Sequence, residues 1–275
     1  MEIINSMTKI PNSKELSIII THHRTPELLD LCLKSIKETV EGIKCEIIIC
    51  DGESEEQSRE FIQDRYPEIK IIPFKKNSGY SKIVNAGLKQ AIADYILILN
   101  ADIIVLNKTI HKMLKFMEDN PNVGISATQL VDFVGNIQAS CFAKPTLGAI
   151  LARRTIFGKL KKGKEILNRF LIKEWDRKSL KDVDWVQGSA MMVRKDAIDK
   201  VGLFDERFFM YFEDADWCRR FWQNGYKVVY YPEVKMAHYY HRSSKKWGGI
   251  LDVFLNKYTR THIISALKYF IKYRG

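Results

Sequence analysis

The sequence has few cysteines and no long apolar run, and each shortage excludes a class of protein. Its 275 residues include five cysteines, an odd number, and no two of them form a C-x-x-C pair. This usage fits reduced thiols in the cytosol better than a disulfide framework. No run of about 18 apolar residues occurs, so no membrane-spanning helix is expected. Residues 1–6 lack a basic stretch followed by a long apolar one, so we expect no signal peptide.

The glycine-rich motifs that cradle phosphates are also missing. The first expected strand is followed by Thr21-His22-His23-Arg24 rather than by G-x-G-x-x-G, and no G-x-x-x-x-G-K-[ST] occurs. This argues against a dehydrogenase or a P-loop enzyme. Helix-turn-helix, zinc and ribonucleoprotein motifs are absent as well. A nucleic-acid partner is therefore not expected, although the formal net charge is +11.

The positive charge is concentrated in two segments. One basic block has no intervening acid: Arg153, Arg154, Lys159, Lys161, Lys162 and Lys164. The segment 241–275 carries eight lysines and arginines against Asp252 alone. Such clusters attract nucleic acid, anionic lipid headgroups or phosphorylated substrates, and charge alone does not choose among these or exclude a merely solvated face.

The first half of the chain alternates short apolar runs with helical patterns, which is typical of a parallel sheet with crossover helices. Strands are expected at 16–21, 45–50, 69–74 and 95–99. Helices are expected after Thr25 and Pro26, then near 55–65, 80–93 and 107–118. The predicted fold class is α/β, with a Rossmann-like, mostly parallel sheet flanked by helices.

The second half is less regular. Short strands are expected near 124–131, 137–141, 189–194, 227–231 and 234–238, with a basic, loop-like region reaching to about residue 181 and a helix from 213 or 214 to 224. We predict one domain over 1–240, with a first half at about 16–125 and a second half at about 126–240. A basic amphipathic helical tail over 241–275 follows, with Ile250, Leu251, Phe254, Leu255 and Tyr258 on one face.

Polar residues follow the expected strands at the sheet edge where open α/β folds bind ligands. Asn100-Ala101-Asp102 follows the run 95–99, and Asp51 follows the second strand. A carboxylate there can hold a divalent cation against phosphates, although Asn and Asp are also common turn residues. After the third strand, Gly79 permits a close approach of backbone to ligand, and Lys82 and Asn85 lie three apart on one helix face.

These motifs as a set resemble glycosyltransferase family 2, with the GT-A fold, and most of all its rhamnosyltransferase-like members. The similarity spans about residues 16–241, and each motif alone is weak. The matching segments are 17–21 with 26–29, Asp51 with Ser54, Asn77-x-Gly79-Tyr80 with Asn85-x-Gly87, 99–102, Gly202-x-Phe204-Asp205-Glu206-x-Phe208-Phe209, and Glu213-Asp214-x-Asp216.

The resemblance implies a role for each matched position. Nucleoside-diphosphate sugar binding would involve Thr21, Arg24, Asp51, Asn77, Gly79, Lys82, Asn85, Asn100 and Ala101. Asp102 matches the metal-binding Asp of the family's D-x-D site, and Asn100 departs from its first Asp. His238 is the expected second ligand, with His241 as a competitor, for Mn²⁺ or Mg²⁺. A hydrogen-bonded core histidine is the alternative for His238.

The catalytic base implied by the resemblance is Asp214, which would take the proton of the acceptor hydroxyl. Glu213 would orient the acceptor, and ordinary helix N-terminal charge is the alternative for both. Trp185, Gln187 and Gly188 would support the sugar, although Trp185 could equally be a core residue. Asp205 receives no chemical role.

The resulting expectation is an inverting, metal-dependent glycosyltransferase of polysaccharide biosynthesis. The favoured donor is dTDP-rhamnose, and the acceptor is a saccharide or a polyprenyl-diphosphate-linked saccharide. We expect a cytoplasmic protein that contacts the inner face of an anionic membrane through its tail, although the tail could instead pack on the domain or form a homodimer contact. The alternative function is a non-catalytic nucleotide-sugar-binding protein on the same scaffold.

Overall fold

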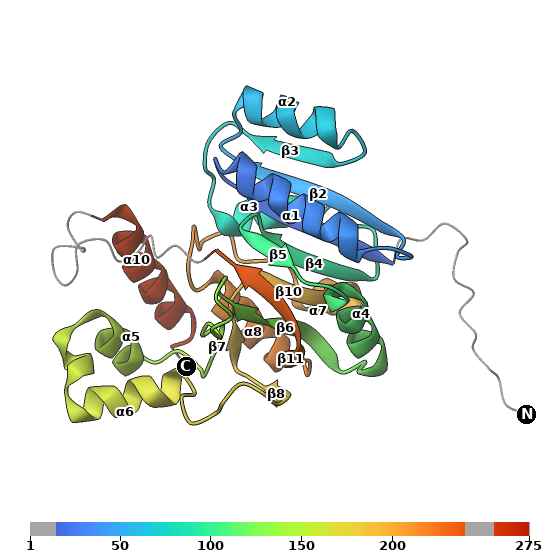
Figure 1. Cartoon of the computed structure of the whole chain (residues 1–275). Coiled ribbons are helices and arrows are strands. Elements are labelled where there is room, and N and C mark those ends of the chain that lie inside the picture. Colours follow the sequence, from blue (N-terminus) through green and yellow to red (C-terminus); the bar gives the residue numbers. More distant parts are fainter. Residues whose placement is uncertain (1–14, 240–255, 275) are drawn as a thin grey trace, which may run out of the picture.

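The chain folds around one large sheet with helices on both faces (Figure 1). The computed structural model describes residues 15–239 and 256–274. Within these ranges, no helix combines the length and the apolar character needed to cross a membrane. The residues 241–255, with His241 and the predicted apolar face at Ile250–Leu255, lie outside the described part.

The first half confirms the expected alternation of strands and helices. Its elements are β1 (Leu16–His22), α1 (Pro26–Thr39), β2 (Cys45–Gly52), α2 (Glu56–Arg65), β3 (Lys70–Phe74), α3 (Tyr80–Leu88) and β4 (Tyr95–Asn100). The helix α3 ends five residues earlier than expected. The residues that follow α3 do not continue the helix, because the N–H of Ile92 donates to Glu46 and the N–H of Ala93 donates to Ser17.

The second half contains more regular structure than the sequence predicted. It comprises β5 (Ile103–Val105), α4 (Thr109–Asp119), β6 (Val123–Val131), β7 (Cys141–Phe142), α5 (Leu147–Arg154), η1 (Ile156–Lys159), α6 (Lys161–Phe170), β8 (Lys181–Asp182), β9 (Trp185–Val186), β10 (Ala190–Arg194), α7 (Lys195–Val201), α8 (Glu213–Gln223), β11 (Lys227–His238) and α10 (Lys257–Lys272).

Three predictions for this half are wrong. Residues 137–141 do not form a strand, since β7 covers only Cys141–Phe142 and Ile137 makes only an isolated bridge to Val131. The region before residue 181 is not loop-like, because α5, η1 and α6 form a helical hairpin there. The two short strands at 227–231 and 234–238 are one strand, β11, whose register against β6 shifts between Tyr231 and Lys235. This irregularity accommodates Pro232 within a single strand.

The strands run in the order β3-β2-β1-β4-β10-β6-β11-β5, with β8 pairing on β11. The pairs within β3-β2-β1-β4 are parallel, β10 is antiparallel to both of its neighbours, and β11 is parallel to β6. Side chains of β1 alternate between two cores: Ile18 and Ile20 pack on one side of the sheet and Ile19 on the other. A sheet covered on both faces explains the nearly continuous apolar runs of its strands.

The described part of the tail packs on the catalytic domain. The helix α10 buries His262 and Tyr269 against Phe212, with ring centroids 5.3 and 5.5 Å from it. Burial, with Arg154 and Arg153 nearby, lowers the pKa of His262 to about 3. Ser265 Oγ donates to the carbonyl of Met210. The inner face of α10 is therefore part of the core, while Ile264, Leu267 and Ile271 on its outer face are exposed.

Candidate active site

The ends of β1 and β4 bring the first group of predicted residues together. The Thr21 hydroxyl donates to Asn100 Oδ1 over 2.9 Å, and the Ala101 N–H donates to the Thr21 carbonyl over 2.9 Å. Parallel pairing places Thr21 directly beside Asn100. Asn100 and Ala101 are thus fixed to the end of β1, and Asp102 follows them at the edge of the sheet.

Asp51 at the end of β2 is paired with His22, a residue whose role the sequence did not reveal. His22 Nδ1 lies 2.8 Å from Asp51 Oδ1, and the Thr25 N–H donates to His22 Nε2. Because Nε2 accepts, the proton sits on Nδ1 and is donated to the carboxylate. Burial alone would raise the pKa of Asp51, but the hydrogen bond from His22 outweighs it and lowers that pKa. Asp51 is therefore an ionised, oriented acceptor.

A tight turn sets the start of α3. Asn77 Oδ1 accepts from the Gly79 N–H, and the Tyr80 N–H donates to the Phe209 carbonyl over 2.7 Å. Gly79 has φ +90°, and a Cβ at this position would lie 2.5 Å from the Phe209 carbonyl oxygen. Only glycine allows this close approach without displacing the segment that leads to α8.

Three predicted donor-binding residues have other partners or lie apart from these contacts. Asn85 is buried, its Nδ2 donates to the Phe204 carbonyl and to Glu206, and its Oδ1 accepts from the Phe204 N–H. Its amide holds the 204–206 turn, and its donor-binding role stays a prediction. Arg24 is exposed and forms ion pairs with Glu53 and Glu55. Lys82 is exposed on α3.

Asp102 and His238 meet where β11 ends. Asp102 Oδ2 lies 3.6 Å from His238 Nε2, and the Tyr239 N–H donates to the Asp102 carbonyl. Gln138 fixes the imidazole from behind: its Nε2 donates to the His238 carbonyl, so its Oε1 is the atom that accepts from His238 Nδ1–H over 2.8 Å. His238 Nε2 is thereby directed toward Asp102.

This pair fits a divalent cation better than it fits a core contact. Asp102 Oδ1 is buried and has no hydrogen-bond partner among the described residues. An imidazole whose second nitrogen donates to an amide or carboxylate is the usual arrangement behind a metal-ligating histidine. In the described ranges no three His, Cys, Asp or Glu side chains cluster as a metal site, so the protein offers two ligands here. Oxygen atoms of a bound diphosphate and water would complete the coordination.

Asp214 lies at the N-terminus of α8 and is held by backbone N–H groups. Its Oδ2 accepts from Gly188 over 3.1 Å and its Oδ1 from Ala215 over 2.8 Å. Glu213 is buried beside it, and Glu213 Oε2 has no hydrogen-bond partner in the described part of the chain. Both carboxyls therefore sit in a low-dielectric setting with unequal hydrogen bonding.

The unequal hydrogen bonding separates the two pKa values. Burial raises the pKa of Asp214 to about 6, with the Gly188 and Ala215 N–H groups limiting the rise. Burial and the neighbouring Asp214 raise the pKa of Glu213 well above its usual value. Near neutral pH Asp214 is therefore mostly ionised, while Glu213 holds its proton more readily than an ordinary glutamate does. A pair of carboxyls split in this way is typical of an acid–base site.

Tyr80 connects the Asp102–His238 pair with the Asp214 corner. Its hydroxyl donates to the Gly188 carbonyl over 2.5 Å, on the same residue whose N–H holds Asp214. Burial, followed by the neighbouring carboxyl groups of Glu213, Asp214 and Asp102, raises the pKa of Tyr80 far above its usual value. These three carboxyl groups therefore all influence one phenol. The sequence contained Tyr80 within a motif but gave no reason to assign it this position.

The predicted sugar-supporting residues line the same corner. Trp185 is buried with Phe142 and Phe170, their centroids 4.7 and 5.9 Å away. Its indole N–H helps to lower the pKa of Asp214, although its geometry falls short of a hydrogen bond. Gln187 is partly buried and its N–H donates to the Ser140 carbonyl. Trp185 is thus a core residue that also borders Asp214.

The backbone that leads into α8 is strained. Tyr211 and Phe212 have φ of 69° and 67°, a left-handed conformation that costs energy for bulky side chains. Phe212 is nevertheless buried and packed against α10. Packing thus holds this conformation immediately before Glu213 and Asp214.

A cavity of about 800 Å³ lies elsewhere, between α1 and α4, and is lined among others by Glu38, His111, Lys112, Phe116 and Tyr231. It contains none of the residues predicted for catalysis or donor binding. The chemistry at the strand ends therefore defines the candidate site, and the cavity does not.

The fold and the site define a GT-A glycosyltransferase. Residues 17–202 match the sequence model of glycosyl transferase family 2, and the chain belongs to this family. The matched range includes Asp51, Gly79 and Asp102 but ends before Asp214 and His238. This result confirms the expected family and enzyme class.

Two curated relatives are rhamnosyltransferases. The chain is 26% identical over 206 residues to N-acetylglucosaminyl-diphospho-decaprenol L-rhamnosyltransferase of Mycobacterium tuberculosis (strain CDC 1551 / Oshkosh), covering 70% of this chain and 66% of that protein. It is 24% identical over 243 residues to dTDP-rhamnosyl transferase RfbF of Shigella flexneri, covering 87% and 73%. The chain thus spans just under two thirds of the M. tuberculosis relative.

A solved structure of GalNAc-T7 with UDP, GalNAc and Mn²⁺ has a TM-score of 0.62 and 14% sequence identity. The similarity covers 84% of this chain and 45% of that one. At this identity the comparison supports the fold alone. It is the expected one, with a sheet flanked by helices.

Proposed function

We propose that the protein transfers a sugar, with inversion, from a nucleoside-diphosphate sugar to a saccharide carried on a polyprenyl diphosphate, and that dTDP-rhamnose is the donor. The names of the relatives support the rhamnosyl group, the dTDP carrier and the lipid-linked acceptor. The same proposal places the protein in the cytoplasm, where nucleotide sugars are available. The observation that carries it is the convergence of Asp102, His238 and the Asp214 corner around Tyr80.

In this proposal each part of the site has a defined task. Thr21, Asp51, Asn77, Asn100 and Ala101 contact the nucleotide and its diphosphate. Asp102 and His238 hold Mn²⁺ or Mg²⁺, which when bound stabilises the charge of the departing diphosphate. The ionised Asp214 accepts the proton of the acceptor hydroxyl. The hydroxyl oxygen of the acceptor then forms the bond to C1 of the sugar as the bond from C1 to the diphosphate breaks. Protonated Glu213 donates a hydrogen bond that orients the acceptor, and Trp185 with Gln187 and Gly188 support the transferred sugar.

The raised pKa of Asp214 favours an enzyme over a non-catalytic binding protein. A binding protein gains nothing from an ionised carboxylate that is buried at a cost in stability, whereas a general base requires one. The strained backbone of Tyr211 and Phe212, directly before Glu213, also favours an enzyme.

A panel of nucleotide sugars tests the proposal. The protein is incubated with each donor and a short lipid-linked saccharide, with Mn²⁺ or with a chelator, and nucleotide release is measured. We expect release from dTDP-rhamnose only with the metal, and stronger thermal stabilisation by dTDP than by UDP or GDP. Release from another donor would contradict the rhamnosyl assignment. Nucleotide binding without release from any donor would support the non-catalytic alternative.

A further inference from the structure

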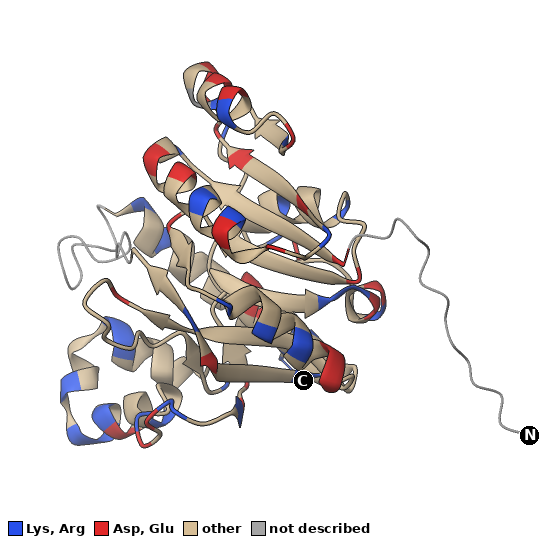
Figure 2. Cartoon of the chain, turned by 45° about the vertical axis from the view of Figure 1, so that its right-hand side comes forward, with Lys and Arg blue, Asp and Glu red and all other residues tan. Residues whose placement is uncertain are grey.

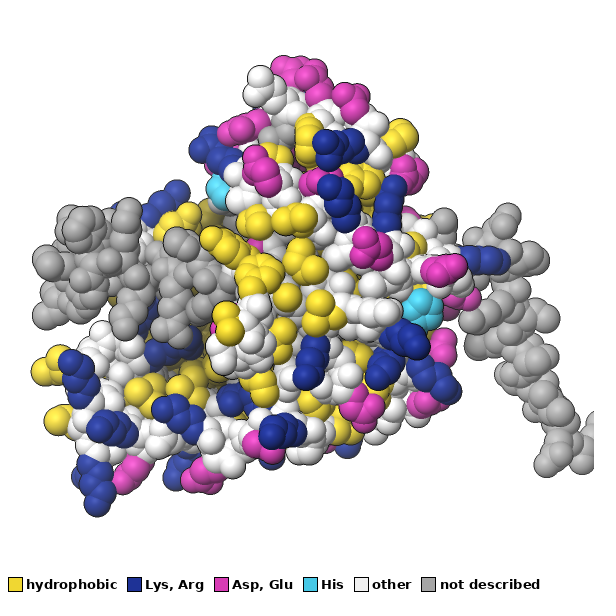
Figure 3. Space-filling model, in the orientation of Figure 1, with side chains coloured by type: hydrophobic (Ala, Val, Ile, Leu, Met, Phe, Trp, Pro, Cys, Tyr) yellow, Lys and Arg dark blue, Asp and Glu magenta, His cyan; other side chains and the backbone are white. Residues whose placement is uncertain are grey.

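The helical hairpin formed by α5, η1 and α6 (residues 147–170) carries an unusual outer surface. Four of its aliphatic side chains are exposed: Leu147 by 59%, Leu151 by 58%, Ile156 by 81% and Leu160 by 60%. Isolated surface leucines are common, but a group of them within one small element marks an interaction surface. Figure 3 shows hydrophobic and basic side chains together at the lower left, over α5 and α6.

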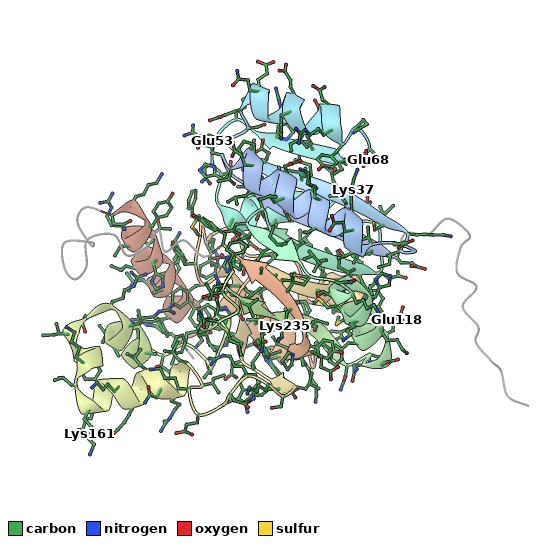
Figure 4. The ribbon with its side chains drawn as sticks, viewed as in Figure 1. Lys37, Glu53, Glu68, Glu118, Lys161 and Lys235 are labelled. Carbon is green, nitrogen blue, oxygen red and sulfur yellow. The ribbon has the colours of Figure 1, made fainter. Side chains whose placement is uncertain are left out.

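The same surface is strongly basic. Residues 147–170 contain seven lysines and arginines and a single acid, Glu165. Lys159, Lys161, Lys162 and Lys164 are exposed, and none forms an ion pair within the described chain. Figure 2 shows several blue segments on this hairpin, whereas α1 and α2 carry red and blue segments together. In Figure 4, Lys161 lies at the outer end of α6 and points away from the sheet.

The exposed aliphatic side chains do not result from loose packing. A Cβ at Gly158 would lie 2.0 Å from the Ala152 carbonyl oxygen, and one at Gly163 would meet the Phe157 carbonyl oxygen as closely. Thr146 and Thr155 cap the first two helical segments with their side chains. The hairpin is therefore a tightly built element whose inner face, with Ala149 and Phe170, is already buried.

The hairpin is also joined to the catalytic corner. Phe170 at the end of α6 stacks on Phe142 at 5.4 Å and contacts Trp185 at 5.9 Å. Trp185 in turn stacks on Phe212, which directly precedes Glu213 and Asp214. A binding partner of the hairpin would thus have a fixed position relative to the acceptor side of the site. Figure 1 shows the hairpin and α10 side by side at that end of the molecule.

We propose that the hairpin 147–170 docks the protein on an anionic lipid bilayer, with Ile156 and Leu160 entering the interface and Lys159, Lys161, Lys162 and Lys164 meeting lipid phosphates. Apolar burial and attraction to anionic lipid act together at such surfaces. This inference rests on the proposed function in that a lipid-linked acceptor gives the docking its purpose. It places the membrane contact on the hairpin, whereas the sequence suggested the tail.

Vesicle co-sedimentation without donor or acceptor tests the docking separately from catalysis. The full chain is mixed with vesicles of phosphatidylcholine alone or of phosphatidylcholine and phosphatidylglycerol in equal parts. We expect binding to the anionic vesicles only, weakening as salt is raised. Replacing the four lysines by glutamine should weaken it about tenfold or more, since each cation near the surface contributes separately. The Ile156→Ser/Leu160→Ser variant should weaken it as well.

Matched controls and contrary results are available within the same chain. Replacing Lys44, Lys70, Lys89 and Lys112 by glutamine makes the same change in net charge at exposed sites outside the hairpin, and Leu31→Ser/Ile92→Ser removes exposed aliphatic side chains elsewhere. Both should bind like the unchanged protein. The proposal is overturned if the hairpin variants also bind normally, or if Ile264→Ser/Leu267→Ser/Ile271→Ser on α10 alone abolishes binding.

Two further measurements distinguish membrane docking from a homodimer contact and from the proposed function. Light scattering after size exclusion should give the same mass for the hairpin variants and the unchanged protein; a change of mass would assign the surface to a second copy of the chain. Transfer to a water-soluble acceptor should be unchanged in the hairpin variants. A protein that binds vesicles but transfers no sugar would contradict the proposed function and leave the docking intact.

Discussion

The Gly188 N–H donates a hydrogen bond to Asp214 Oδ2 over 3.1 Å, so a strand-end loop and the start of α8 share one contact at the proposed base. The Gly188 carbonyl accepts from Tyr80 at the same time. The peptide groups around Gly188 therefore position both the carboxylate and the phenol. Substituting Asp214 examines this arrangement directly.

We expect Asp214→Asn to lower the turnover rate by at least about a hundredfold, the usual contribution of a general base. Donor binding should be kept, because the amide oxygen can still accept a hydrogen bond at this position. Nucleotide release and thermal stabilisation by the donor measure the two effects. Asp199→Asn, at an exposed position on α7, is the control. Near-normal turnover of Asp214→Asn would show that another group is the base.

The pKa of Asp214 predicts how activity and stability depend on pH. Turnover should fall as the pH drops below about 6, since protonated Asp214 cannot accept a proton. The folded pKa is raised above its unfolded value, so protonation favours folding and this contribution is lost as the pH rises through about 6. Asp214→Asn should therefore raise the melting temperature near pH 8 and change it little near pH 4. Equal shifts at both pH values would contradict the assignment.

Gln138→Leu should weaken metal binding about tenfold or more, because the amide no longer fixes the His238 ring. The measurement is the concentration of Mn²⁺ that half-stabilises the protein in the presence of nucleotide. Gln223→Leu, at an exposed position on α8, is the control and should leave the concentration unchanged. An unchanged value for Gln138→Leu would exclude His238 as a ligand whose orientation depends on Gln138.

Lys272→Met should destabilise the protein by about 2 kcal/mol, because it leaves a buried carboxylate with fewer partners. Lys272 Nζ lies 2.5 Å from Asp216, which is fully buried on α8, and 2.8 Å from Asp205. Arg220 and Tyr273 still contact Asp216 in the variant, which limits the loss. Chemical denaturation measures the loss in the free energy of unfolding. Arg274→Met, at an exposed position just after α10, is the control. Equal stabilities of the two variants would show that Lys272 on α10 does not stabilise the start of α8.

The strands and the position of Asp102 at a strand end were predictable because their signals are local. Apolar runs such as 95–99 identify buried parallel strands, and Asp102 follows from its position at a strand end. The pairing of Asp102 with His238 required the resemblance, since 136 positions separate them in the chain. Gln138 gave no signal, because its function depends on a contact across two strands.

The predictions for the hairpin and for Asn85 meet the same physical limit. The hairpin 147–170 was expected to be loop-like because basic residues interrupt its apolar pattern, yet its outer face keeps those apolar residues exposed. The role of Asn85 at the donor stays a prediction, although its amide nitrogen and oxygen already have partners in the 204–206 turn. A single sequence does not show which neighbour satisfies a polar side chain, and tertiary packing decides both cases.

The order of the catalytic parts along the chain limits how the protein can be divided. The range that identifies the family ends at residue 202, before both the proposed base and the histidine that faces Asp102. The strained entry to α8 is in turn supported by a helix that starts only at Lys257. A fragment trimmed to the recognisable family segment would still be assigned to the correct enzyme class while lacking half of its chemistry. Swaps between relatives should accordingly exchange residues 203–274 as one unit.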